Sequence, residues 1–174
     1  MVFIEKQGLK IWWLYLIAAT TIFPTVAIAL FYNGGMGWNE LTASYFAPIW
    51  AGLIPFALIY LLAQCKLTLK IDDDGVSYRY ALVSWKLKYI PWREIDKAYI
   101  RKYDAFSEYG GYGVRYRLWF KLKDKAYLLN DHNMGLQLEL KNDLKVLFSS
   151  NKIEELNVFL VNLKKEINIQ AIQQ

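Results

Sequence analysis

Residues 66–83 read KLTLKIDDDGVSYRYALV, and this stretch sets the fold expected for most of the chain. Leu67, Leu69 and Ile71 alternate with polar residues, as in a strand that buries one face. The DDDG tetrapeptide that follows is typical of a tight turn, and alternation resumes from Val76 to Val83. The pattern therefore predicts two antiparallel strands joined by a turn.

The same alternation continues along the chain and predicts further strands at 85–90, 95–103, 114–122, 125–130, 136–140 and 144–148. A helix is expected next, because Asn151 is a suitable N-cap residue and Glu154 completes a capping-box-like pair. Its apolar residues recur at helical spacing: Ile153, Leu156, Phe159, Leu160, Leu163 and Ile167. We therefore expect an antiparallel β-barrel or sandwich with this amphipathic helix closing one open end.

The first third of the chain has a different composition. Residues 11–32 and 45–65 contain no charged side chain, and as helices each reaches about 30 Å, the thickness of a bilayer core. Two buried helices of a soluble core are the alternative, but no polar stripe interrupts either stretch. The sequence therefore predicts two transmembrane helices, at about 11–32 and 45–65.

The segment between these stretches decides their topology. Residues 33–44 form a short polar linker without Lys or Arg, whereas Lys6, Lys10, Lys66 and Lys70 flank the outer ends. By the positive-inside rule we expect an inner-membrane, multi-pass protein with both termini in the cytoplasm. The expected domains are a transmembrane hairpin at 1–65, a cytoplasmic domain at 66–167 and a short polar tail at 168–174.

Several motifs follow one another in a characteristic order: YGGYGVR at 109–115, AY at 126–127, GLQLEL at 135–140 and EEL at 154–156. With the two apolar stretches in front, this order resembles small bacterial membrane proteins with a pleckstrin-homology-like (bacterial PH) domain. The resemblance implies an α+β membrane protein in which an N-terminal transmembrane helical hairpin precedes a PH-like antiparallel β-barrel or sandwich, capped by a C-terminal amphipathic helix. It implies no enzymatic reaction.

The glycine loop, Tyr109, Gly110, Gly111, Tyr112 and Gly113, admits three interpretations. It lacks the Lys and Ser/Thr of a Walker loop, and it opens a strand rather than the helix that a dinucleotide-binding turn requires. It matches only the middle of the RNA-recognition signature. A structural bend, with tyrosines at its rim, is the preferred interpretation.

Basic residues supply the candidate interaction face. The first 65 residues carry two basic and two acidic side chains, so the chain's net charge of +5 lies entirely in 66–174. Arg101, Lys102, Arg115 and Arg117 are expected to form a basic face for a partner, with a merely solvated face as the alternative. We expect a non-enzymatic module that binds an unidentified protein partner or self-associates at the membrane, or else senses anionic lipid.

Catalysis, cofactors, metals and nucleic acid are not predicted. His132 stands alone in an NDHN loop, Cys65 has no second cysteine to pair with, and the three consecutive aspartates lack the spacing of a calcium loop. The lipid bilayer and a protein partner or second copy are therefore the expected partners.

Overall fold

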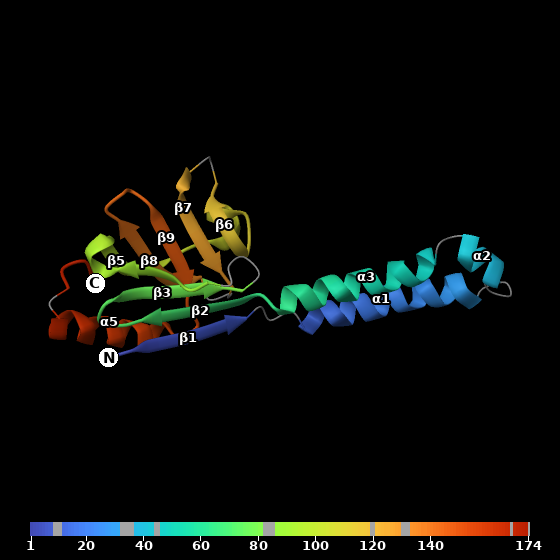
Figure 1. The fold of residues 1–174 in the computed structure, drawn as a ribbon, viewed down its shortest axis with the longest axis horizontal. Helices are drawn as coiled ribbons and strands as arrows, with labels where there is room; N and C mark the ends of the chain where they lie inside the picture. Colours follow the sequence, from blue (N-terminus) through green and yellow to red (C-terminus); the bar gives the residue numbers. More distant parts are fainter. Residues whose placement is uncertain are drawn as a thin grey trace. The chain divides into compact units, whose positions relative to one another are not determined.

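The structure, a computed structural model, describes residues 1–174 except 9–11, 32–36, 44–45, 82–85, 119–120, 130–132, 168 and 174. The chain divides into two compact units (Figure 1). One, the strand unit, combines Met1–Leu9 with Cys65–Gln174, and the other, the helical unit, comprises Lys10–Gln64.

The helical unit contains α1 (Trp12–Phe31), α2 (Trp38–Ala43) and α3 (Ala47–Ala63). Helices α1 and α3 lie side by side (Figure 1). A β-carbon at Gly52 of α3 would lie 3.2 Å from a methyl group of Val26 in α1, so the absence of a side chain permits the close approach. Large apolar side chains remain exposed on both helices, among them Phe31 at 78% and Tyr60 at 60%.

The predicted transmembrane hairpin is contradicted by this unit. In the part of the chain that the structure describes, no helix is both long and apolar enough to cross a membrane. Helix α3 has 17 residues, about 25 Å, which is shorter than the hydrocarbon core of a bilayer. The predicted multi-pass location in the inner membrane, which was inferred from that hairpin, is contradicted with it. Residues 11, 32 and 45 of the predicted spans lie outside the described residues.

The strand unit is an α+β fold with two sheets. The first has the order β1-β2-β3-β4 and consists of β1 (Phe3–Gly8), β2 (Lys66–Ile71), β3 (Gly75–Tyr80) and β4 (Lys88–Pro91). The predicted hairpin is confirmed, because Leu67 pairs with Tyr80 and Ile71 with Val76. In its turn, the Asp72 carboxylate accepts the N–H of Gly75 at 3.1 Å.

Strand β1 was missed by sequence reasoning. It pairs antiparallel with β2, yet two of its three buried positions are polar, Glu5 and Gln7. These side chains bond to Ser149 and Ser150 at the end of β9. Hydrophobic alternation therefore gave no signal for β1, although it is part of the sheet.

The second sheet has the order β5-β8-β9-β7-β6. It consists of β5 (Ile95–Lys102), β6 (Gly113–Arg117), β7 (Lys121–Leu128), β8 (Met134–Leu140) and β9 (Lys145–Ser149), and it is followed by α5 (Ile153–Ile167). Strands lie near the predicted positions, but the predicted strand 114–122 is wrong as one element, because β6 ends at Arg117 and β7 begins at Lys121. The antiparallel expectation is also wrong at one position, since β7 and β9 pair in parallel. A short helix, α4 (Ala105–Tyr109), was not predicted.

One core joins both sheets and α5. Tyr78 of β3, Tyr127 of β7 and Phe148 of β9 form a cluster of rings with centroids 4.8–5.4 Å apart. From α5, Leu156, Leu160 and Leu163 pack into the same core, as the helical spacing predicted. The strand unit therefore has its own continuous hydrophobic interior.

Candidate functional site

Strand β5 is one edge of the five-stranded sheet, and the C-terminal segment contacts that edge at one position. The Ala98 N–H donates to the Ala171 carbonyl at 2.7 Å, and the Ala98 carbonyl accepts from the Gln173 N–H at 2.9 Å. Ala98 and Ile172 thus form an isolated parallel bridge. At this one position, the outer edge of β5 is paired with another segment of the same chain.

The segment is held there by its own apolar residues. Ile172 is 2% exposed within the core, and Ile169 and Ala171 pack against that core. Sequence reasoning assigned 168–174 to a polar tail, because four Gln and Asn residues surround the two isoleucines. The two isoleucines three residues apart, Ile169 and Ile172, were the sequence feature that could have predicted a buried contact here.

Beyond Ala98, none of the described residues forms a bridge to the outer edge of β5. In an antiparallel pair, residues two apart direct their backbone groups to the same side. Since Ala98 directs its N–H and carbonyl away from β8, Ile100 presents its own pair at the same edge. Among the described residues, no backbone bond reaches Ile100 from that side. Its N–H and carbonyl are thus unpaired on that side within the residues that the structure describes, which do not include Gln174.

A small cavity lies directly beside this open position. Its volume is about 110 Å³, and it is lined by Ile100, Asn157, Leu160, Val161, Lys164, Ile172 and Gln173. Its lining combines the apolar side chains of Ile100, Leu160, Val161 and Ile172 with one basic residue, Lys164. Such a cavity suits one aliphatic side chain with an acidic neighbour.

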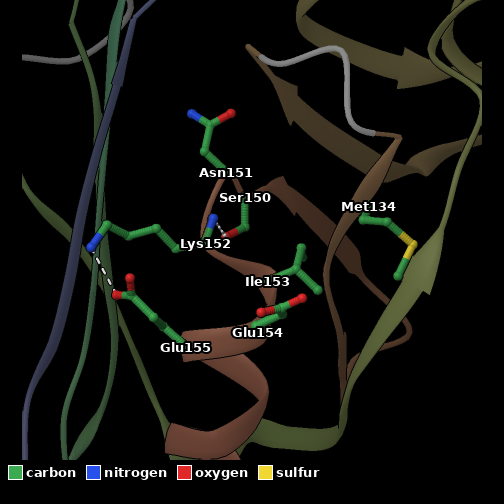
Figure 2. Close-up of a pocket in the computed structure, with 7 residues that line it drawn as sticks. All are labelled: Met134, Ser150, Asn151, Lys152, Ile153, Glu154 and Glu155. Carbon is green, nitrogen blue, oxygen red and sulfur yellow. Dashed lines mark hydrogen bonds and ion pairs between the residues drawn. The ribbon is translucent and has the colours of Figure 1, made fainter.

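A second cavity, of about 400 Å³, lies at the beginning of α5 (Figure 2). It is lined by Met134, Ser150, Asn151, Lys152, Ile153, Glu154 and Glu155. Ile153 and Glu154 of α5 lie on one side and Met134 of β8 on the other (Figure 2). Lys152 is paired with Glu155 at 2.7 Å, so Glu154 is the carboxylate that faces the cavity without an ion pair among the described residues.

Both cavities are lined in part by residues of α5. Met134 pairs with Lys102 at the end of β5, two residues beyond Ile100. On the helix, Ile153, Asn157 and Val161 are spaced by four and therefore lie along one face. We call the two cavities together, with the α5 face that carries these residues, the α5–β5 groove.

The four basic residues predicted as one face are divided by the structure. Arg101 and Arg117 both reach Glu108, with nitrogen–oxygen distances of 3.0 and 3.2 Å. Arg117 also pairs with Asp124 at 3.3 Å. Two positive and two negative side chains therefore compensate each other, whereas Lys102 and Arg115 are exposed.

Tyr109 lies at the centre of this ion-pair network. Its hydroxyl accepts a hydrogen bond from Arg101 at 2.8 Å and donates one to Asp124 at 3.1 Å. Burial, reinforced by the Asp124 charge, raises the pKa of Tyr109 above its ordinary value. Tyr109 is thus a buried structural residue rather than the rim residue expected from the sequence.

The glycine loop forms the bend that the sequence predicted. Gly110, Gly111 and Gly113 have φ angles of 72°, 124° and 102°, which favour glycine. Gly110 ends α4, and Asp104 begins it by accepting the N–H groups of Phe106 and Ser107. The Asp104 cap was the sequence signal for this missed helix. Tyr112 is half-buried beside the loop.

Among the described residues, no group of three or more His, Cys, Asp or Glu side chains that could hold a metal occurs. His132 lies outside the described residues.

No protein-family model matches this sequence, and no curated protein matches it. The resemblance to PH-like membrane proteins therefore stays a prediction.

Proposed function

We propose that the strand unit is a non-enzymatic protein-interaction module that binds an extended segment of a partner protein in the α5–β5 groove. The observation that carries the proposal is the N–H and carbonyl of Ile100, which no described residue pairs, next to Ala98, which already pairs with the C-terminal segment. Main-chain bonds at a sheet edge supply affinity, and pockets for individual side chains supply specificity.

The groove also suggests the chemistry of the bound segment. An aliphatic side chain would fill the cavity at Ile100, Leu160 and Val161. An acidic residue would lie near Lys164, and the opposite end, where Glu154 lines the second cavity, would disfavour one. The excess charge of +5 in 66–174 would further favour acidic partners.

A sensor of anionic lipid is the alternative function, and it has less support. It would require the four basic residues to act together, but Arg101 and Arg117 are engaged with Glu108 and Asp124. Lys102 and Arg115 alone offer a weak attraction to headgroups.

Selection from a displayed library of random eight-residue peptides on the immobilised full chain tests the proposal. We expect selected peptides to share an aliphatic residue with an acidic residue nearby, and to lose at least tenfold in affinity for Val161→Glu. Val158→Glu is the matched control, because Val158 lies on the same helix, is 60% exposed and lines neither cavity.

A second matched pair tests the charge. Lys164→Glu should weaken the selected peptides severalfold, whereas Lys165→Glu, at the neighbouring exposed position, should change their affinity little. Equal effects of the two members in both pairs would show that the peptides bind elsewhere, and the proposal would then be wrong. Peptides derived from this chain itself would identify a second copy as the partner.

A further inference from the structure

Apolar side chains gather around the glycine loop, away from the α5–β5 groove residues. Phe106 is 66% exposed and packs edge-on against Tyr112, with ring centroids 5.4 Å apart. Leu118 is 40% exposed, and its N–H donates to the Glu108 carbonyl at 2.8 Å, which fixes it beside α4. We call Phe106, Tyr112, Leu118 and the adjoining Arg115 the glycine-loop surface.

The surface is held rigidly despite its exposure. Asp104 caps α4 at one end, Gly110 ends it at the other, and the Glu108 carboxylate beneath is bound by two guanidinium groups. Arg115 is tied to the loop by a 3.1 Å hydrogen bond from its Nε to the Tyr112 carbonyl. Rigid aromatic residues with an arginine are the side chains that most often dominate protein-binding energy, because little entropy is lost on contact.

The charge of the glycine-loop surface indicates which kind of partner it would bind. The nearby cations Arg101 and Arg117 are compensated by Glu108 and Asp124, and the Asp104 carboxylate accepts two backbone N–H groups. Arg115 is exposed, and no carboxylate of the described residues pairs with it. The uncompensated charge of the surface is therefore positive.

From these observations we infer that the glycine-loop surface is a second docking site, which binds an acidic protein segment containing an aromatic or aliphatic residue. The apolar side chain would pack on Phe106 and Leu118, and a carboxylate would accept hydrogen bonds from the Arg115 guanidinium. This site does not depend on the α5–β5 groove.

The probe for this site is a random copolymer of glutamate and tyrosine, measured against the full chain by fluorescence anisotropy, with polyglutamate for comparison. We expect the copolymer to bind more tightly than polyglutamate. Arg115→Glu should weaken it at least tenfold and Phe106→Ser severalfold. Arg79→Glu, the matched control, replaces an exposed strand arginine outside the surface and should have little effect.

Thermal unfolding of each variant checks that its fold is kept, and Arg115→Gln provides a milder replacement that should weaken binding in the same direction. If Arg115→Glu and Arg79→Glu lost copolymer affinity equally, the binding would depend on net charge alone, and the inference would be overturned. So would binding of phosphatidylglycerol vesicles but not of the copolymer. Val161→Glu should leave copolymer binding unchanged, which separates this test from that of the groove.

Discussion

The carboxylate of Glu5 accepts a hydrogen bond of 2.6 Å from the hydroxyl of Ser150, a residue 145 positions away along the chain. Its other oxygen accepts the Asn151 N–H at 2.7 Å, and Glu5 is only 3% exposed. The first strand of the chain therefore holds the segment that leads into α5. This contact fixes one end of the α5–β5 groove.

Replacement of Glu5 is expected to destabilise the whole strand unit. Glu5→Ala leaves the buried Ser150 hydroxyl and the part-buried Asn151 N–H without their acceptor, at a cost of about 2–4 kcal/mol in the free energy of unfolding. Lys6→Ala, at the neighbouring exposed position, should cost less than about 0.5 kcal/mol. Urea unfolding of both variants measures the difference. Similar midpoints for the two would show that the Glu5 contacts contribute little.

Tyr109 is expected to stabilise the attachment of α4 to the sheet. Tyr109→Phe keeps the buried ring but removes the hydroxyl that links Arg101 to Asp124, at a cost of about 1–3 kcal/mol. Tyr116→Phe is the matched control, because Tyr116 is 50% exposed. Thermal unfolding should show a clearly lower midpoint for Tyr109→Phe alone. A wild-type midpoint in that variant would contradict a structural role for the hydroxyl.

Stability should fall on acidification, in part through Glu139. The Lys145 ammonium, 2.7 Å away, lowers the pKa of Glu139 below its ordinary value of 4.5 against the opposing effect of burial, and the Tyr99 hydroxyl assists. A carboxylate whose pKa is lower in the folded state stabilises the fold above the unfolded pKa, and that stability is lost as pH falls through the folded pKa.

Glu139→Gln should therefore reduce the loss of stability between about pH 5 and pH 3, as measured by urea unfolding at each pH. Lys145→Met removes the same interaction from the other side and should reduce that loss similarly. An unchanged pH dependence in both variants would exclude this pair as a contributor.

The helical unit is expected to make the full chain prone to association in water. Exposed side chains on α1 include Trp12 at 68%, Phe23 at 74% and Phe31 at 78%. Contiguous apolar surface of this kind is rarely left in contact with water. Light scattering should show polydisperse association in plain buffer that a mild detergent reverses. A monodisperse monomer at high concentration without detergent would contradict this expectation.

The sequence predicted the elements whose residues alternate or repeat strictly. The prediction was correct for strand β2 and for the apolar face of α5, because each element buries one regular face. It missed β1, since Glu5 and Gln7 face inward to satisfy specific hydrogen bonds rather than to bury apolar area. Local pattern carries no information about a polar side chain whose partner is more than a hundred residues away.

For the candidate sites too, local pattern predicted some features, whereas features that depend on distant contacts were missed. The glycine loop was recognised from composition, and its positive φ angles agree with a bend. The basic face was assembled from strand alternation, which could not reveal that Glu108 of an unpredicted helix would bind Arg101 and Arg117. The groove depends on long-range contacts between β5, α5 and Ile172, which no local motif encodes.

Amide hydrogen exchange at Ile100, measured with and without a selected peptide, tests the central proposal most directly. Because the Ile100 N–H faces the open edge, a strand bound in the groove should slow its exchange at least tenfold. The Arg101 N–H faces β8 and should change little, which provides a control within the same strand. Unchanged exchange at Ile100 with saturating peptide would contradict strand addition at β5.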